Sequence, residues 1–430
     1  MKEKQKKMMI LGASALQVPA IKKAKELGYQ IILVDYDENA VGFPLADVKL
    51  VVSTLDQEEV YRQALIYQPD VVLTSTSDGP VRTAAYVNEK LGKRPDLSYE
   101  NALCATIKSR MRDRLKEYGV PIPEYYAADD YEVFFDAVNK LGGDCVVKPA
   151  DNAGSRGVVH LDYEAYQGNF GVQLEHDTVS RKESVERLAA YYKEIYRYSR
   201  GNARGGTVMV EEYMHGPEVS VEIMVIEGEP HILTVTDKFI TPPPYFVELA
   251  HCEPSRLDAE TQRQIRKVAV QAVKAIGIEN APAHVEIKVT EDGPKIVELA
   301  ARLGGDFITS RLVPLSTGID MVGASVLLAT GEVPELTPKW NRGAAIHFLH
   351  TGPEQAGVIT RITVPDVLYG LEGVEEICLY KKSGDSVQGT RSSNDRLGHV
   401  ITTGETPEQA MELGKQVMAQ IYVEMEETSK

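Results

Sequence analysis

The sequence predicts a mixed α/β and α+β protein of about three domains. At 430 residues, the chain exceeds the roughly 100–200 residues of one ordinary domain. Apolar strands alternate with helices over about the first hundred residues, which is typical of a parallel sheet with helices on both faces. The later parts combine strands with amphipathic helices. We therefore expect domains at residues 1–105, 106–330 and 331–430.

The first domain carries one strand end that resembles part of a dinucleotide site. Such a site would pair Asp35, after the second strand, with three glycines in the first turn. That turn, 12–17, contains one glycine, so nicotinamide binding is not expected and the domain is predicted to form a wall of a site. The expected strands are 8–11, 30–34, 48–52 and 71–74, and the expected helices are 20–27, 58–67 and 80–91.

The central and C-terminal parts carry longer elements. A helix rich in basic residues is expected at 107–119, where Gly119 ends it. A polar segment, 178–204, is predicted to form a surface helix with a loop, and an amphipathic helix is expected at 407–425. Further strands are expected at 145–148, 208–213, 219–226 and 232–239, and a further helix at 259–275.

Charge and composition exclude several classes of partner. The chain has 47 Lys and Arg against 63 Asp and Glu, a formal charge of -16. Nucleic-acid and anionic-membrane binders need a basic face, so neither partner is expected. No apolar run approaches the roughly 20 residues of a membrane helix. The four cysteines have no paired spacing, which predicts no disulfide framework or zinc site and favours the cytoplasm.

The most informative segment is a predicted β-hairpin at 283–302. With a three-residue loop, 291–293, Thr290 lies opposite Pro294 and Glu286 falls directly opposite Glu298. Two carboxylates in this arrangement repel each other unless a divalent cation or a proton lies between them. The alternatives are a solvated hairpin face, or a two-residue loop that shifts the pairing by one. The expected face also carries His284, Lys288, Ala300 and Arg302.

A second motif joins a lysine at a strand end to a glycine-containing loop. Lys148 ends the strand at 145–148 and is followed by the polar stretch 151–157. Backbone N–H groups of such a loop, together with its cations, can bind phosphates. It is not a Walker A loop, and an ordinary exposed turn is the alternative. The candidate ligands in the loop are Asn152, Gly154, Ser155, Arg156 and Gly157.

A third motif places acidic residues at a strand end and after a turn. The backbone around Glu211, Glu212 and Tyr213 could contact an adenine edge, and Glu218 could accept hydrogen bonds from ribose hydroxyls. Acidic strand ends are also common on surfaces, so this motif alone is weak.

As an ordered set, these motifs resemble the ATP-grasp superfamily. The nearest branch contains L-amino acid ligases, glycinamide ribonucleotide synthetase, biotin carboxylase and the carbamoyl-phosphate synthase large subunit. The resemblance implies a pre-ATP-grasp, Rossmann-like domain, an ATP-grasp domain with a lid at about 121–210, and a small mixed C-terminal domain. The motifs are the basic helix with Lys108, Val-Val-Lys-Pro at 146–149, Val-Glu-Glu-Tyr-Met-His-Gly-Pro-Glu at 210–218, His-Val-Glu-Ile-Lys at 284–288 and Val-Glu-Leu-Ala-Ala-Arg-Leu-Gly-Gly at 297–305.

The resemblance also implies roles in nucleotide binding. Lys108 and Lys148 would contact the phosphates of ATP, beneath a lid formed by the loop 152–157. Glu211 and the hinge after it, with Glu212 and Tyr213, would hold adenine, and Glu218 would bind ribose.

Metal binding and catalysis are implied for the hairpin. Glu286 and Glu298 would bind Mg²⁺, or Mn²⁺ in its place. Many members carry Asn two residues after the second acid, where this chain has Ala300, so the metal could have one protein ligand fewer. Arg302 would steady an acyl phosphate or a substrate carboxylate, and His284 would contact substrate or pack beside the metal. Together with Lys148, these two are the candidate catalytic residues.

The expected reaction is ATP-dependent ligation of a carboxylate to an amine through an acyl phosphate. Both substrates would be small molecules, amino acids or similar metabolites, and a homodimer is expected from the resemblance. Glu248 and Arg391 are the candidate acceptor residues, because Arg391 between Gly and Ser residues could form a carboxylate fork. The alternatives are a bicarbonate-activating enzyme and a nucleotide-binding sensor that has lost catalysis.

Overall fold

The N-terminal part of the computed structural model is a four-stranded parallel sheet. The structure describes residues 5–93, 96–152, 156–162, 181–243 and 245–427. The strand order is β3-β2-β1-β4, and each pairing is parallel. The predicted alternation of strands and helices is confirmed here. The elements are β1 (Lys7–Leu11), α1 (Val18–Glu26), β2 (Gln30–Asp35), β3 (Val48–Val51), α2 (Gln57–Tyr67), β4 (Val71–Leu73), α3 (Gly79–Lys90) and α4 (Tyr99–Cys104).

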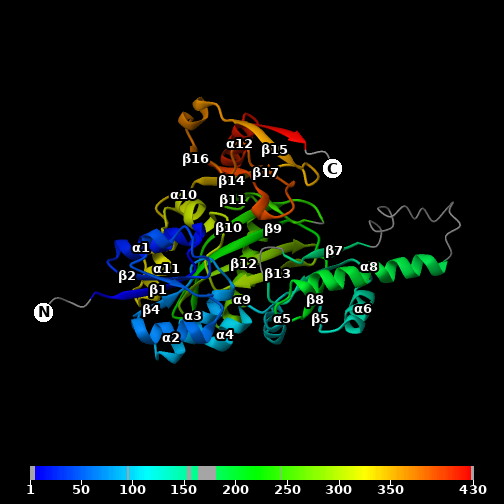
Figure 1. Ribbon diagram of the computed structural model, residues 1–430, viewed down its shortest axis with the longest axis horizontal. Helices are drawn as coiled ribbons and strands as arrows, with labels where there is room; N and C mark the ends of the chain where they lie inside the picture. Colours follow the sequence, from blue (N-terminus) through cyan, green and yellow to red (C-terminus); the bar gives the residue numbers. More distant parts are fainter. Residues whose placement is uncertain (1–4, 94–95, 153–155, 163–180, 244, 428–430) are drawn as a thin grey trace.

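Both faces of this sheet are apolar because successive strand residues point to opposite sides. Met8 and Ile10 pack with α1, whereas Met9 and Leu11 pack with α2 and α3. Helix α11 (Met321–Ala329) contributes to the first of these cores and lies beside α1 (Figure 1). The N-terminal sheet is therefore covered partly by chain from far beyond residue 105. The Asp35 carboxylate, at the end of β2, accepts a hydrogen bond from the Ala13 N–H in the loop that follows β1.

An eight-stranded antiparallel sheet forms the centre of the molecule (Figure 1). Its order is β13-β12-β9-β10-β11-β14-β18-β16, so strands before and after the predicted boundary at residue 330 share one sheet. Helices α5 (Lys108–Glu117) and α9 (Ala259–Ile276) pack on one face of its first half. The strands are β9 (Glu218–Ile226), β10 (Glu229–Ile240), β11 (Glu248–Glu253), β12 (Ala281–Thr290), β13 (Gly293–Ala300), β14 (Gly343–Leu349), β16 (Val374–Leu379) and β18 (Gly398–Gly404).

Two smaller sheets flank the central one. The sheet β5-β8-β6-β7 packs with α6 and α8, and α8 projects away from the body of the molecule in Figure 1. The sheet β17-β15-β19 lies at the C-terminal end. The elements are β5 (Tyr125–Ala128), α6 (Tyr131–Lys140), β6 (Cys145–Pro149), β7 (Val159–Leu161), α8 (Arg181–Gly201), β8 (Val208–Glu212), α10 (Val313–Thr317), β15 (Gly357–Thr363), β17 (Ser386–Val387), α12 (Pro407–Met418) and β19 (Tyr422–Glu427).

The predicted helix at 407–425 is wrong in its last part. Helix α12 ends at Met418, and the following residues form β19, which pairs antiparallel with β15. Tyr422 and Val423 are aromatic and β-branched, and such residues favour a strand when an edge is available to pair with. The edge belongs to a segment some sixty residues earlier, which helical periodicity does not reveal.

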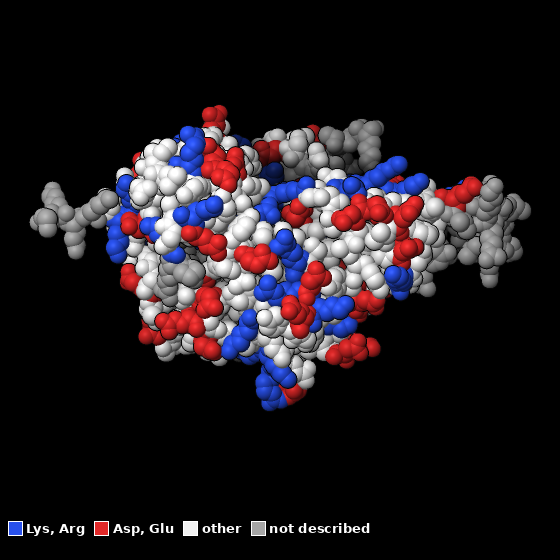
Figure 2. Space-filling model, turned by 90° about the horizontal axis from the view of Figure 1, so that it is seen from below, with Lys and Arg blue, Asp and Glu red and all other residues white. Residues whose placement is uncertain are grey.

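Charged groups of both signs are intermingled on the face shown in Figure 2. Within the described ranges, no single helix has the length and apolar composition to cross a membrane. Two consecutive helical segments, Ile308–Thr317 and Met321–Ala329, have this length and apolar composition when taken together, but the chain bends by 114° between them.

Candidate active site

The β12–β13 hairpin carries the two acidic residues singled out by the sequence. Its tip is a two-residue loop, because Thr290 pairs with Gly293, so the predicted three-residue loop is wrong. A bulge then inserts Val297 into β13, and beyond it Glu286 lies directly opposite Glu298, as predicted. The bulge adds back the one residue that the shorter loop removes.

Arg112, on α5, holds this bulge from the side. Its side chain is fully buried, and its guanidinium donates to the carbonyls of Ile296 and Val297 at 2.9 and 2.8 Å. The same group forms a fork on the Glu211 carboxylate, with both contacts at 2.9 Å. One buried arginine therefore ties α5 and β8 to the strand that carries Glu298.

Glu211 lines the first of the two cavities described below and is held there by two cations. Its carboxylate is engaged by Arg112 and, at 2.7 Å, by the Nζ of Lys148, so it orients this lysine. Burial raises the pKa of Glu211, but the two cations outweigh burial and lower it to about 2. Burial also lowers the pKa of Lys148. The backbone N–H of Glu212 donates to the Glu124 carbonyl, and Glu212, Tyr213 and Met214 also line this cavity.

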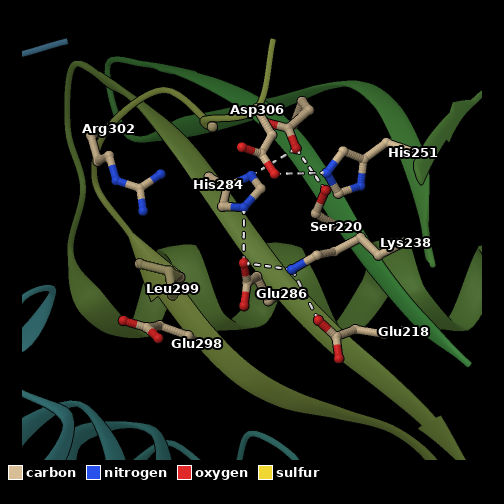
Figure 3. Close-up of polar contacts among 12 residues, drawn as sticks. Glu218, Ser220, Lys238, His251, His284, Glu286, Glu298, Leu299, Arg302 and Asp306 are labelled. Carbon is tan, nitrogen blue, oxygen red and sulfur yellow. Dashed lines mark hydrogen bonds and ion pairs between the residues drawn. The ribbon is translucent and has the colours of Figure 1, made fainter. Parts of the chain in front are cut away.

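A lysine contacts each of the two hairpin carboxylates. Lys108 Nζ lies 2.9 Å from Glu298 Oε1 and also donates to the Asn152 carbonyl. Lys238, on β10, lies between two acids: its Nζ is 2.9 Å from Glu286 Oε1 and 2.9 Å from Glu218 Oε1 (Figure 3). Burial lowers the pKa of Lys238, but these carboxylates outweigh burial and raise the pKa well above the ordinary value. The predicted ribose ligand, Glu218, is thus held by a lysine.

His284 lies behind Glu286 in the same polar layer (Figure 3). Its Nδ1 is 2.8 Å from Glu222 Oε1, and its Nε2 is 3.2 Å from Glu286 Oε1. Burial lowers the pKa of His284, but the two carboxylates outweigh burial and raise it to about 9. A Cβ on Gly304 would lie 2.7 Å from His284 Nδ1, so the backbone leaves no space for another residue there.

Two cavities meet at these carboxylates. The first, of about 160 Å³, combines cationic and apolar walls. Of the predicted loop ligands, Asn152 and Arg156 line it, while Gly154 and Ser155 lie outside the described residues. Gly157 has a φ of +79°, and a Cβ there would come within 2.8 Å of Pro149. The other lining residues include Lys108, Lys148, Glu212, Tyr213, Glu218, Lys238, Phe246, Glu286 and Glu298.

The second cavity, of about 260 Å³, is mainly polar. Arg302 lies in its wall and is oriented by Asp78, with Nε 2.7 Å from Oδ1. Burial lowers the pKa of Arg302, and the Asp78 charge outweighs burial and raises it. The two cavities share four lining residues: Lys238, Glu248, Glu286 and Glu298. A group bound in one cavity therefore reaches the same carboxylates as a group bound in the other.

The two predicted acceptor residues have different positions. Glu248 lines both cavities and accepts a hydrogen bond from Ser393 Oγ. Arg391 is not among the residues that line either cavity, which corrects its predicted place: its side chain is half exposed and contacts the Pro353 carbonyl and Glu354. The Gly and Ser residues near Arg391 suggested a carboxylate fork, but the loop directs the guanidinium away from both cavities.

Arg396 occupies the buried position instead. It forms a fork on Asp306, at 2.7 and 2.8 Å, and Asp306 also lies 3.2 Å from His251 Nε2. Asp306 and Phe307 both have positive φ, 49° and 63°, a costly conformation for residues with side chains. Such strain is retained where surrounding contacts over-determine the backbone, here at the wall of the second cavity.

Comparisons with known proteins agree with this arrangement. A model of the ATP-grasp domain matches residues 141–310, and a model of L-amino acid ligase C-terminal domain 2 matches residues 347–426. The chain therefore contains an ATP-grasp domain, followed by a domain similar to the second C-terminal domain of L-amino acid ligases. The two matches together include the hairpin, Lys148, Glu211 and the strands that line the second cavity.

Three relatives illustrate how far the similarity of this ATP-grasp chain extends. Alanine–anticapsin ligase of Bacillus subtilis strain 168 is 26% identical over 261 residues, 58% of this chain and 51% of that protein. The L-arginine-specific L-amino acid ligase of Bacillus subtilis is 23% identical over 365 residues, 83% of this chain and 80% of that protein. The structure of L-amino acid ligase from Bacillus licheniformis matches with a TM-score of 0.78 at 20% identity, over 98% of this chain and 100% of that one. The chain spans from about a fifth to a little over half of the first curated relatives.

The donor set of this ATP-grasp site fits Mg²⁺. Glu286 and Glu298 pair across the hairpin and line both cavities. In the described ranges, no cluster of three or more His, Cys, Asp or Glu side chains is arranged to hold a metal ion. Mg²⁺ is usually held by one or two carboxylates, with water and phosphate oxygens completing its shell. Two carboxylates, each already balanced by a lysine, therefore suit an ion that arrives with a nucleotide.

Proposed function

We propose that this chain is an ATP-dependent carboxylate–amine ligase. The observation that supports the proposal is the junction of two cavities at Glu286 and Glu298. One cavity has cations suited to phosphates, and the other is polar and carries an arginine suited to a carboxylate. A phosphoryl group bound at the junction would be within reach of a substrate in the second cavity.

ATP would occupy the first cavity. Lys108 and Lys148, both buried, would face its phosphates, and Glu211 would keep Lys148 in place. Tyr213 and Phe246, whose rings lie 6.3 Å apart, offer apolar surface for adenine. We propose that the loop 152–157 acts as the lid of this cavity.

The acid and the amine would share the second cavity. Arg302, held by Asp78, would bind the substrate carboxylate, and Glu248 would accept hydrogen bonds from a substrate ammonium group. Ser393, from the C-terminal region, lines this cavity, and Arg396 holds Asp306 in its wall, so that region would complete the wall around the amine. A polar wall favours small zwitterions such as amino acids over apolar acids.

The chemistry requires positioning and charge neutralisation, with no nucleophilic side chain. A substrate carboxylate oxygen attacks the γ-phosphorus of ATP, the bond to the β,γ-bridging oxygen breaks, and ADP leaves. An amine then attacks the acyl carbon, phosphate leaves, and the amine loses a proton. Lys108, Lys148 and Arg302 would neutralise the charge that moves in these steps. Mg²⁺ held by Glu286 and Glu298 would add charge neutralisation at the phosphate oxygens.

Phosphate release from ATP tests the proposal most directly. The full chain is supplied with MgATP and pairs from a panel of amino acids and other small carboxylates, and products are identified by mass spectrometry. The expected result is phosphate release that depends on a substrate pair, with a condensation product. ADP binding without turnover on every pair would instead favour a sensor that has lost catalysis, and release that depends on bicarbonate would favour a carboxylase-type enzyme.

Two further proposals accompany this function. All four cysteines have free thiols, which supports an enzyme that works in the reducing cytoplasm. A homodimer remains a proposal, and sedimentation velocity of the full chain tests it.

A further inference from the structure

A separate cavity lies on the other side of the central sheet. It has a volume of about 330 Å³ and is bounded by β10, β11 and β14 and by helix α12. Met411 and Met418 contribute to its apolar wall. Its ionisable lining residues are Arg256, His347, His350 and Lys415, and none of its described lining residues is acidic. In a chain with a formal charge of -16, this grouping of basic side chains around an apolar hollow is unexpected.

The alternation of strand residues separates this cavity from the proposed active site. Lys238 faces the active site and its neighbour Phe239 lines the separate cavity. His251 and Ala250 divide between the two sides of β11 in the same way. Helix α12 covers this second face of the sheet, beside β14 (Figure 1). A ligand here would not compete with ATP for space.

His347 is the most unusual residue of the cavity wall. Its side chain is 8% exposed, and neither ring nitrogen has a hydrogen-bond partner among the described residues. Burial, with a smaller contribution from the charge of Lys415, lowers the pKa of His347 to about 4. A buried polar group without a partner is costly, and native proteins keep few of them. Both ring nitrogens are themselves buried, so the ring contributes an uncharged wall to the cavity.

Helix α12 is adapted to this histidine. A Cβ at Gly414 would lie 2.3 Å from His347 Nδ1, so only glycine leaves room for the ring. Glycine within a helix is unfavourable compared with other residues. The chain thus carries two unfavourable features, the glycine and the unpaired imidazole, that meet at one cavity.

The charge around the cavity indicates the sign of the ligand. Arg256 contacts Asp237 at 3.2 Å, and its guanidinium lies 5.1 Å from the centre of the Phe239 ring. Lys415 is exposed, and within the described ranges no acidic side chain forms an ion pair with it. The charge of Arg256 is therefore balanced by Asp237, whereas the charge of Lys415 is available to an anionic ligand.

We propose that this cavity binds a small organic anion, a carboxylate on an aliphatic or aromatic body. The carboxylate would lie near Lys415 and Arg256, and the body would pack against Met411, Met418 and Phe239. The inference is independent of the proposed ligase activity, because no residue of this wall lines either active-site cavity.

The test measures binding of three probes that share one apolar body. Hexanoate, hexylamine and 1-hexanol are titrated by calorimetry into the full chain saturated with MgATP. Hexanoate is expected to bind at one site, at least tenfold more tightly than the amine or the alcohol. Lys415→Glu is expected to weaken hexanoate binding at least tenfold. The matched control, Lys382→Glu, alters another exposed lysine outside this wall and is expected to leave hexanoate binding unchanged.

Three results would overturn the proposal. Equal affinity for the three probes would show an apolar hollow without anion selectivity. Loss of hexanoate binding in Arg302→Met, with retention in Lys415→Glu, would place the anion in the second active-site cavity. A dimer in sedimentation velocity that Lys415→Glu converts to monomer would show that a second copy of the chain occupies this wall.

Discussion

Lys238 is the cation that two carboxylates of the proposed active site share, and replacing it with methionine tests how the site is balanced. Its side chain is 4% exposed, and its Nζ lies 2.9 Å from both Glu218 and Glu286. Methionine has a similar length and no charge. Lys238→Met would therefore leave two adjacent carboxylates without their shared counter-charge.

The expected cost follows from burial. Removing one partner of a buried ion pair costs about 3–5 kcal/mol. Because the side chains of Glu218 and Glu286 keep 11% and 24% exposure, solvent compensates part of this loss. We expect a loss at the lower end, about 3 kcal/mol in free energy of unfolding. The matched control is Lys274→Met, which removes a surface pair with Glu229 at 3.2 Å and should cost less than about 1 kcal/mol.

The assay is urea unfolding at neutral pH, first with a chelator and then with millimolar MgCl₂. Mg²⁺ should restore part of the stability of Lys238→Met, because a divalent cation can take the place of the ammonium beside Glu286. It should have little effect on Lys274→Met. Equal stability of the two variants in chelator would refute the reasoning, as would an equal response of both to Mg²⁺.

Three further changes test the site and the core. Glu298→Gln should abolish substrate-dependent phosphate release and keep the wild-type circular dichroism spectrum; full activity would contradict the metal assignment. Arg396 holds Asp306 in the wall of the second cavity, so Arg396→Ala should raise the KM for the amine at least about tenfold. Arg391→Ala should change this KM less than about twofold, because Arg391 is half exposed outside the cavity. Similar effects of the two variants in steady-state kinetics would contradict the assignment of Arg396, in place of Arg391, to amine binding. Burial and the charge of a second buried acid raise the pKa of Glu253 from 4.5 to about 8. The unfolded carboxylate therefore ionises first, so the contribution of Glu253 to stability is greatest below about pH 4.5 and is lost toward pH 8, by at most ~5 kcal/mol. Glu253→Gln should remove that slope in urea unfolding across this range, and an unchanged slope would exclude Glu253 as its source.

The hairpin shows how local sequence reasoning can reach the correct pairing with an incorrect turn. Alternation placed Glu286 and Glu298 on one face, and both lie there. The bulge at Val297 was not readable, because its stabilising partner, Arg112, lies 185 residues away in sequence. Arg112 itself was interpreted only as one of the basic residues of the helix predicted at 107–119, and it is fully buried.

The missed residues share a cause. Lys238 lies 48 residues from Glu286, and Arg396 lies 90 residues from Asp306. Apart from Asp237 and Lys238, the residues 232–240 are apolar or threonine, and this was a usable signal for Lys238, since an unpaired lysine is rarely fully buried. Nothing in the segment that holds both Arg391 and Arg396 distinguished the exposed arginine from the buried one.

The sequence by itself determined the alternating N-terminal sheet, the strands that carry the motifs, and the pair of acids on the hairpin. These follow from periodicity and turn chemistry, which act over a few residues. The tertiary structure decided which cation meets which carboxylate, which arginine holds Asp306 in the wall of the second cavity, and that strands on either side of residue 330 form one sheet. Those outcomes depend on pairing between distant strands and on burial of charge, and neither is encoded within a local stretch of chain.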